Sequence, residues 1–537
     1  MSLGPALNLF GAGVVIHVTT FSSGEWDLHT NKLIVSAILA GVVPAFLSTT
    51  VFLSGTWLQF AGVAFAIWGL FLGGVALSMT IYRLFLHRTR RFPGPFLARW
   101  TGWYWSYLYA RKLHLYDEMM TLHAKYGDYV RIGPNTISII NPRAMQAIFG
   151  HNTSCIKSSF SDFALPKVLL NTERSKDKHS ARRKVWEPAF NVRALKSYEP
   201  IMNLHASQLL DRLKEATDRV GGNQSNTGYM NITTTMNDYF FNLMSHFAFS
   251  KTYTIPYPDA HTSRGDSSTD SDSNRTFVIE TIHRGGAILG FLALVPWVFR
   301  ILRALPFLAR SMVRFDNYGT HLVKERRAMK PEQPDVFGFL LENFEREENE
   351  AVSVGRRGEI EQRERLRQLE ADAMTIALAG TDTSAAAVTA ALYLLASHPE
   401  QIDRLRGELQ ELGFDPRMPD HSILAGPVLR GIIDETLRIC PPAPVTGLFR
   451  QTAEEGHMIG DTFVPGGVQV TVPIYVCQHD ERYFVHAEEF IPERWGERRG
   501  ELVKEGALFA PFSIVSPFHF PNNHQSINIV RAPANLS

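Results

Sequence analysis

Three apolar stretches at the N-terminus constrain the fold of this chain more than any other feature. They cover about Pro5–Thr20, Leu33–Leu53 and Trp57–Tyr82. The second and third contain no charged residue and, at about 1.5 Å per residue, are long enough for a hydrocarbon core of about 30 Å. The first is shorter and could span with strain, lie at the membrane surface or pack on the other two. We expect a membrane anchor rather than a buried hairpin of a soluble protein.

Basic residues directly after the third stretch indicate how the anchor is oriented. Arg83, His87, Arg88, Arg90 and Arg91 form a cluster of the kind that marks the cytoplasmic side of a span. The run Pro93-Gly94-Pro95 then ends any helix, because proline fixes φ and removes a donor. The first stretch lacks a basic segment before it and a small-residue cleavage site after it, so we do not expect a removable signal peptide.

The composition favours a large globular part and excludes several kinds of partner and site. The chain has 537 residues, 45% of them hydrophobic, which is enough for a large core. Its 54 basic and 53 acidic residues give a formal charge of +1, so no overall field favours a nucleic-acid partner. Cys155, Cys440 and Cys477 are far apart, which indicates neither a disulfide framework nor a zinc site.

Beyond about Leu97 helical patterns dominate, and the predicted fold is mainly α with small β-sheets. Val130–Ile132 and Thr136–Ile140 flank a turn sequence and predict a hairpin. Asp259–Thr276 is rich in Ser, Asp and Thr and predicts a loop. Ala287–Leu308 is apolar but is interrupted by two prolines, which favours a channel wall or a patch at the membrane surface over a fourth span.

One predicted helix, Leu366–Ser397, carries weak helix formers in its middle, at Ala379–Ser384. The Thr383 hydroxyl can bond the Ala379 carbonyl one turn back, which loosens the helix and leaves room for a bound molecule or water. A solvent-facing polar patch is the alternative, but Ala and Leu surround the helix on all sides. Weak helix formers in the middle of an otherwise well-formed helix usually mark a functional site.

A second motif pairs Glu435 with Arg438 on one face of a helix, because residues three apart are neighbours there. Such a pair alone is usually an ordinary surface salt bridge. Here it is followed by Pro492-Glu493-Arg494-Trp495, and Arg494 could close an Arg–Glu–Arg network with shared bidentate geometry.

Together these motifs resemble those of the cytochrome P-450 family. Ala379–Ser384 is similar to the family's A-G-x-D-T-T, Glu435–Arg438 to its E-x-x-R, and Pro492–Trp495 to its P-E-R-F/W meander. The helix around His179–Arg183 resembles the one that contacts the haem propionates, and Arg450 lies where the family places another propionate arginine. More than one predicted span makes the chain similar to fungal biosynthetic members.

The resemblance implies a haem-dependent monooxygenase that uses O2 to oxidise a lipophilic small molecule, in a secondary-metabolite pathway. It implies haem b (iron protoporphyrin IX) as cofactor and electrons from NADPH through a reductase. The expected location is the endoplasmic reticulum membrane, with the catalytic domain facing the cytosol. The expected organisation is an anchor over residues 1–92, a cytochrome P-450 domain over 93–514 and an unrelated tail over 515–537.

The resemblance also implies roles for single residues. Asp382 and Thr383 would organise water and deliver protons to dioxygen, with Gly380 against the cofactor. Propionate partners would be His179, Arg183 and Arg450, for which surface solvation is the alternative. Glu435, Arg438 and Arg494 would hold the proximal side. Substrate selectivity would come from three segments, Ser158–Leu169, Ala287–Leu308 and Val445–Phe449.

The C-terminus departs from the family pattern F-x-x-G-x-R-x-C-x-G, whose cysteine binds the haem iron. Phe509–Ile514 begins as expected, but His519 stands at the cysteine position and Val515 at that of the first glycine. His519 could be an axial ligand in principle, without the electron donation of a thiolate. Our hypothesis is a splicing or gene-model fault, so that a correctly spliced form carries the cysteine. The alternative is a catalytically dead membrane-bound relative that binds a ligand or partner without turnover.

Overall fold

The computed structural model describes most of the chain: residues 3–22, 24–47, 57–112, 114–221, 230–252, 270–331, 333–353, 359–415, 426–444 and 449–514. The chain divides into two compact units. The first comprises residues 1–163, 288–310 and 447–472, and the second comprises 164–287, 311–446 and 473–537.

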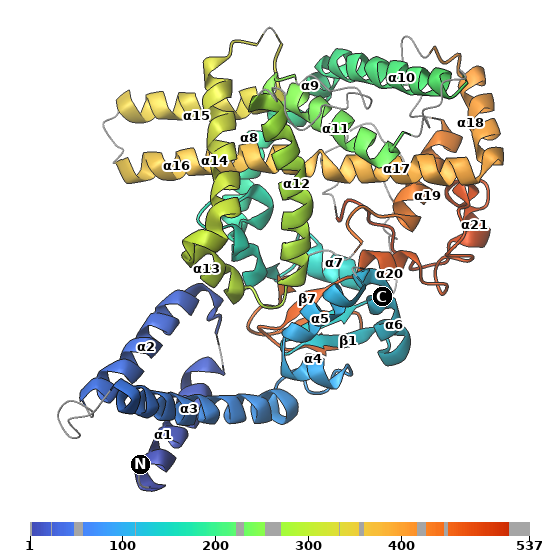
Figure 1. Cartoon of the computed structure of the whole chain (residues 1–537). Coiled ribbons are helices and arrows are strands. Elements are labelled where there is room, and N and C mark those ends of the chain that lie inside the picture. The colour runs from blue at the N-terminus through green and yellow to red at the C-terminus, as the bar shows by residue number, and fades with distance from the viewer. Residues whose placement is uncertain are drawn as a thin grey trace. The chain divides into compact units, whose positions relative to one another are not determined.

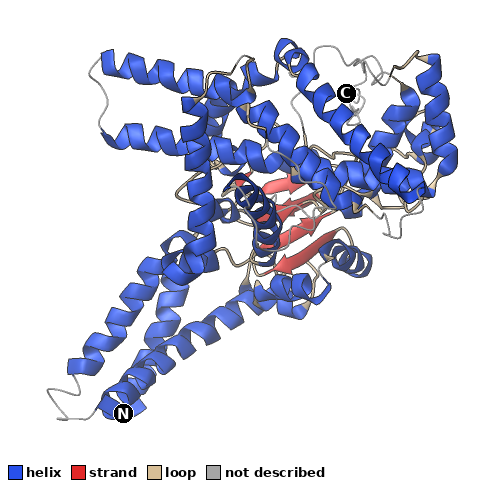
Figure 2. Cartoon of the chain, turned by 45° about the horizontal axis from the view of Figure 1, so that its top comes forward, coloured by secondary structure: helices blue, strands red, loops and turns tan. Residues whose placement is uncertain are grey.

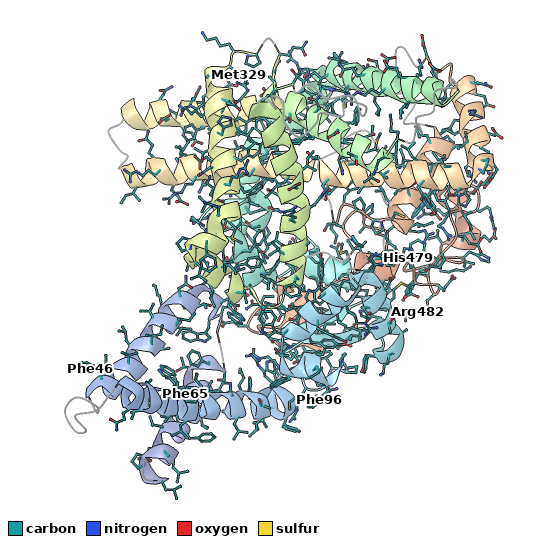
Figure 3. The ribbon with its side chains drawn as sticks, in the orientation of Figure 1. Phe46, Phe65, Phe96, Met329, His479 and Arg482 are labelled. Atoms are coloured by element: carbon teal, nitrogen blue, oxygen red, sulfur yellow. The ribbon has the colours of Figure 1, made fainter. Side chains whose placement is uncertain are left out.

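The predicted apolar stretches are helical in the first unit. They form α1 (Leu3–Ile16), α2 (Thr30–Leu47) and α3 (Trp57–Ile81), and α1 and α3 continue as the π-helical turns η1 (His17–Phe21) and η4 (Tyr82–Leu86). Large apolar side chains project from them: Phe46 is 56% exposed and Phe65 81% exposed (Figure 3). Residues 48–53 of the second predicted stretch lie outside the described residues.

Helix α1 packs closely on α3, and this packing leaves α1 able to cross a membrane beside α3. A Cβ on Gly13 would lie 2.1 Å from the Phe71 carbonyl oxygen, and a Cβ on Gly74 would lie 2.1 Å from that of Phe10. His17 Nδ1 lies 2.9 Å from Ser78 Oγ. Contacts therefore advance along both helices together, from Phe10 with Gly74, through Gly13 with Val75, to His17 with Ser78. The two helices run in the same direction.

Among the described residues, three segments are long and apolar enough to cross a membrane: Leu3–Phe21, Ala61–Leu86 and Ile360–Ser397. The third differs from the other two, because two of its carboxylates are buried in ion pairs. Glu370 lies 2.8 Å from Lys167 Nζ, and Asp372 pairs with Arg182. This helix is apolar because it belongs to the core of the second unit, not because it faces lipid.

The first unit contains one five-stranded sheet with the order β1-β2-β7-β4-β3 and a separate hairpin (Figure 2). β2 and β7 are parallel, and the other pairs are antiparallel. The predicted hairpin at residues 130–140 is confirmed as β1 and β2. The strands are β1 (Tyr129–Gly133), β2 (Thr136–Ile139), β3 (Ile156–Lys157), β4 (Arg450–Gln451), β5 (His457–Ile459), β6 (Thr462–Val464) and β7 (Gln469–Thr471), and the helices beside them include α4 (Phe96–Trp100), α5 (Trp103–Lys112), α6 (Leu115–Tyr126), α7 (Ala144–Phe149) and α13 (Trp297–Ala304).

The second unit is helical, which confirms the predicted mainly α fold with small sheets (Figure 1). Its main core lies where α11, α14, α15 and α16 meet, around Phe241, Leu322, Phe337 and Leu369. The helices are α8 (Lys176–Trp186), α9 (Val192–Ser197), α10 (Glu199–Gly221), α11 (Ile232–Phe249), α12 (Asp270–Phe291), α14 (Pro306–Ala328), α15 (Val336–Ser353), α16 (Glu359–Ala379), α17 (Asp382–Ser397), α18 (Pro399–Glu411), α19 (Pro427–Ile439), α20 (Ile474–Gln478) and α21 (Arg499–Leu502), with α12 and α14 each continuing into the first unit.

Two element predictions need correction. The helix predicted over Leu366–Ser397 begins earlier and is two helices, α16 and α17, interrupted at Gly380 and Thr381. The loop predicted over Asp259–Thr276 is wrong for residues 270–276, which open α12, while 259–269 lie outside the described residues. In contrast, Ala287–Leu308 is divided as expected, because Pro296 caps α13 and Pro306 opens α14.

Candidate active site

The break between α16 and α17 is made by hydroxyl groups that compete with the helix backbone. Thr381 Oγ1 donates to the Ala377 carbonyl at 3.0 Å, and Thr383 Oγ1 donates to the Ala379 carbonyl at 2.8 Å. Gly380 lies against α11, where a Cβ would be 2.3 Å from Met244 Cε. The bond of Thr383 is the one that the sequence predicted. A polar, irregular turn therefore interrupts the apolar segment that the end of α16 and α17 form.

Asp382 is the first residue of α17, and the first turn of a helix favours a negative charge. Its Oδ1 lies 2.8 Å from Nε2 of His283 on α12, and both side chains are 46% exposed. Thr383 is also exposed. The imidazole and the carboxylate are half-exposed and in direct contact, so a proton can pass between them and solvent. Sequence reasoning missed His283, since a lone histidine 99 positions away carries no signal of its partner.

Helix α8 presents two of the predicted cofactor residues. His179 and Arg183 are one turn apart, on the same face, and both are half-buried. The neighbouring Arg182 is occupied, because it donates to the Val168 carbonyl at 2.8 Å and pairs with Asp372 of α16. For the Arg183 side chain, no hydrogen bond or ion pair is found within the described residues, so its guanidinium can bind an anionic group such as a propionate.

Arg450 belongs to the first unit, on the short strand β4. It is half-buried, its guanidinium lies 5.1 Å from the centroid of the Phe149 ring, and burial lowers its pKa. The structure thus places His179 and Arg183 together on one helix, and Arg450 on a strand of the other unit.

The structure brings Glu435, Arg438 and Arg494 together as a fully buried network. Arg438 donates to both Glu435 oxygens at 2.9 Å, and Arg494 Nε donates to Glu435 Oε1 at 3.0 Å. The Glu435 carboxylate accepts two further hydrogen bonds, from Trp495 Nε1 at 2.9 Å and from the Ile491 amide at 3.1 Å. All three charged side chains have no exposed surface.

The remaining donors of the two arginines bind backbone carbonyls rather than other side chains. Arg438 binds those of Gln478, Ala487 and Glu489, and Arg494 binds those of Val485, His486 and Leu502. The network therefore holds the whole irregular stretch from residue 478 to residue 502, where buried carbonyls need donors. Trp495 in turn packs on Phe509, with ring centroids 4.2 Å apart, at the start of the departing C-terminal motif.

The described residues include side chains that could hold haem propionates, His179 and Arg183 on α8 and Arg450 on β4, but they do not include the position where the family pattern has its iron-binding cysteine. Among them no group of three or more His, Cys, Asp or Glu side chains could hold a metal ion. Cys155 and Cys477 are buried, and burial raises the pKa of the Cys440 thiol, which disfavours its thiolate. His519 and residues 445–448 of the third selectivity segment lie outside the described residues.

Comparisons with known proteins agree with these motifs. The chain is 34% identical over 512 residues to cytochrome P-450 monooxygenase FCK2 of Fusarium pseudograminearum, covering 94% of this chain and 86% of that one. It is 31% identical over 518 residues to cytochrome P-450 monooxygenase phqL of Penicillium fellutanum, covering 95% and 84%. It is 32% identical over 447 residues to tryprostatin B 6-hydroxylase of Aspergillus fumigatus, covering 83% and 73%.

A solved structure shares the fold. The retinoic acid-bound cyanobacterial CYP120A1 superposes with a TM-score of 0.55 at 18% identity, covering 78% of this chain and 85% of that one. The family model for cytochrome P-450 matches residues 93–514, which include the broken helix, the Glu–Arg–Arg network and the propionate candidates. The chain belongs to the cytochrome P-450 family.

Proposed function

We propose that the chain is a membrane-anchored, haem-dependent monooxygenase that oxidises a lipophilic small molecule of secondary metabolism. The observation that carries this proposal is the break at Gly380 and Thr381, which presents Asp382 and Thr383 inside a family-matched domain. Haem b (iron protoporphyrin IX), when bound, supplies dioxygen activation and electron transfer. The chain's own residues bind this group, orient water and move protons.

Residues around the break between α16 and α17 would deliver protons. His283 exchanges protons with solvent and passes them to Asp382, at the 2.8 Å separation of Nε2 and Oδ1. The Thr383 hydroxyl can leave the Ala379 carbonyl and orient a water molecule, because this bond is local and the side chain is exposed. Gly380 lets the break lie directly against Met244 of α11, which a side chain at position 380 would displace.

Basic side chains would bind the propionate groups of the cofactor. Arg183 and His179 on α8 and Arg450 on β4 would neutralise the two propionates, as charge-assisted bonds to a carboxylate require. The network of Glu435, Arg438 and Arg494 would keep the stretch from residue 478 to 502 in place beside the proximal face. His519 stands at the position where the family pattern has its iron-binding cysteine.

The proposed setting is the endoplasmic reticulum membrane, with residues 1–92 as anchor, 93–514 as catalytic domain in the cytosol and 515–537 as a tail outside the family pattern. The exposed apolar side chains of α1–α3 and the basic cluster after α3 support this orientation. A membrane-bound reductase would supply electrons from NADPH. One relative is named a hydroxylase of tryprostatin B, and a lipophilic natural product is the corresponding class of substrate here.

The test is the difference spectrum of the reduced, carbon monoxide-bound full chain in microsomes. We expect haem binding without the red-shifted Soret band of thiolate ligation for the chain as printed, and that band for the variant His519→Cys. His524→Cys serves as the control, since it adds a thiol five residues away (524 − 519). Absence of bound haem in all three chains would contradict the proposal and favour a relative without turnover.

A further inference from the structure

Aromatic side chains from the substrate-selecting segments meet in the first unit. Phe160 lies 5.4 Å from Phe163 and 5.8 Å from Phe449, and Phe163 lies 6.2 Å from Phe299, between ring centroids. Trp105 adds a further ring 6.0 Å from Phe449. We call Trp105, Phe160, Phe163, Phe299 and Phe449 the aromatic cluster. Three segments that are remote in sequence thus share one packed group.

A loop that comprises the turn before α2 and the first two residues of α2, Trp26–Asn31, docks beside this aromatic cluster. Ser159 Oγ donates to Asp27 Oδ2 at 3.0 Å, and Asn31 Nδ2 donates to the Arg300 carbonyl at 3.2 Å. Ser159 precedes Phe160 and Arg300 follows Phe299, so each bond fixes a residue next to a cluster phenyl ring. Helix α13 also packs against α2 and against the short turn Asp27–His29.

The docked loop has internal structure of its own, as a positioning element requires. Thr30 Oγ1 donates to the Asp27 carbonyl at 2.7 Å, and the Trp26 ring lies edge-on to Phe21 at 5.2 Å. Ser159 is buried, whereas Asp27 is half-buried. Ser159 Oγ also accepts from Gln469 Nε2 at 3.4 Å, but its buried O–H donates to Asp27, and loss of that acceptor leaves the donor unsatisfied. The bond from Ser159 to Asp27 therefore fixes the start of its segment.

We propose that the loop Trp26–Asn31 of the anchor positions the substrate-selecting residues around Phe160 and Phe299, through Asp27 and Asn31. The anchor then does more than hold the domain at the membrane: it sets the placement of two selectivity segments. That these segments select substrate rests on the proposed function, whereas the docking itself does not.

Amide hydrogen exchange of the full chain in lipid nanodiscs tests this proposal. For Asp27→Ala we expect exchange about tenfold faster at the amides of residues 159–163 and 297–304, the factor that loss of one hydrogen bond produces. Asp27→Asn keeps an acceptor oxygen and should restore wild-type protection, which a general loss of stability would not allow. Asp218→Ala removes an exposed acid on α10 and should change nothing.

A double-mutant cycle separates direct docking from independent effects. Ser159→Ala should reproduce the exchange of Asp27→Ala, and the double variant should exchange no faster than either single variant. Additive increases, or wild-type exchange in Asp27→Ala, would overturn the proposal. If Asp27→Ala fails to fold, Ser159→Ala with Asn31→Ala makes the same comparison. Amide exchange can be measured without bound haem. A negative result in the carbon monoxide spectrum would therefore contradict the proposed function, and unchanged exchange in Asp27→Ala would contradict the docking of the loop.

Discussion

The Glu435 carboxylate has no exposed surface and accepts hydrogen bonds from Arg438, Arg494, Trp495 and the Ile491 amide. Elsewhere the same i,i+3 spacing gives a different interaction. Glu364 and Arg367 on α16 are each 52% exposed and lie 3.5 Å apart. Spacing alone does not distinguish the two pairs, because what differs is burial and the number of donors around the carboxylate.

This contrast predicts unequal effects of one substitution at two sites. Glu435→Ala leaves two buried guanidinium groups without their carboxylate and should destabilise the domain by about 3–5 kcal/mol. Glu364→Ala removes a solvated pair and should cost less than about 0.5 kcal/mol. Melting curves followed by circular dichroism measure both. Similar curves for the two variants would contradict a structural role of the network.

A buried histidine pair makes stability depend on pH. His205 Nε2 lies 3.1 Å from His246 Nδ1, between α10 and α11, and burial followed by the neighbouring His246 lowers the pKa of His205 from 6.5 to about 4. The unfolded chain therefore binds a proton below about pH 6.5 that the folded chain does not bind until about pH 4.

Stability should consequently fall by roughly 3 kcal/mol as the pH drops from 6.5 to 4, through this group. His205→Gln removes the titration and should flatten that part of the profile. Thermal unfolding at pH 7 and at pH 4.5 measures the slope. The exposed His151 provides the control, and an equal effect of His151→Gln would exclude the assignment to His205.

At the scale of elements, the contact between α19 and the turn Pro492–Trp495 (η9) depends on a missing side chain. A Cβ on Gly431 would lie 2.7 Å from the Pro492 carbonyl oxygen, which is backbone and cannot move aside cheaply. Gly407 on α18 has nothing within 4 Å of the same position. Both glycines look alike in the sequence, since each lies inside a helical pattern.

Alanine should therefore act in opposite directions at these two glycines. Gly431→Ala should destabilise by about 1–3 kcal/mol, because the close approach of α19 and η9 is lost. Gly407→Ala should stabilise by about 0.5–1 kcal/mol, since glycine is a poor helix former. The melting temperatures of the two variants, compared with that of the unchanged chain, measure both effects. A higher melting temperature for Gly431→Ala would show that α19 and η9 approach less closely.

The helix break illustrates which elements local sequence can predict. The side chains of Thr381 and Thr383 reach carbonyls only four positions back, so the disturbance at Gly380 was predictable from spacing. Its partner His283 was not, because the contact depends on how α12 lies beside α17. The earlier start of α16, at Glu359, was missed since the polar residues there do not show a helical apolar face.

At the scale of the whole molecule, the anchor helices constrain membrane topology. α1 and α3 run in the same direction, and α2 connects them, so a chain that crosses with all three begins on the side opposite the domain. We propose that the basic residues after α3 keep the domain on the cytosolic side. The apolar segment Ile360–Ser397 does not add a span, because Glu370 and Asp372 are paired within the core.

Glycosylation mapping tests the three-span arrangement. A sequon added before Met1 should be glycosylated in microsomes, and the same sequon added after Ser537 should remain unmodified, because the lumen holds the transferase. A shift in gel mobility that glycosidase reverses measures each site. An unmodified N-terminal sequon with an intact anchor would leave α1 on the cytosolic side and only two spans in the membrane.

Features that depend on neighbouring residues could be read from the sequence: the lengths of the apolar N-terminal stretches, the hairpin of β1 and β2, the weak point at Gly380 and the family motifs. Periodicity and turn chemistry act over a few positions, and they leave a readable pattern. Only the tertiary structure decided which carboxylates are buried, that Gly13 and Gly74 meet, and that Asp27 contacts Ser159. Such contacts join residues far apart in the chain, and their energy comes from desolvation and packing rather than from local propensity.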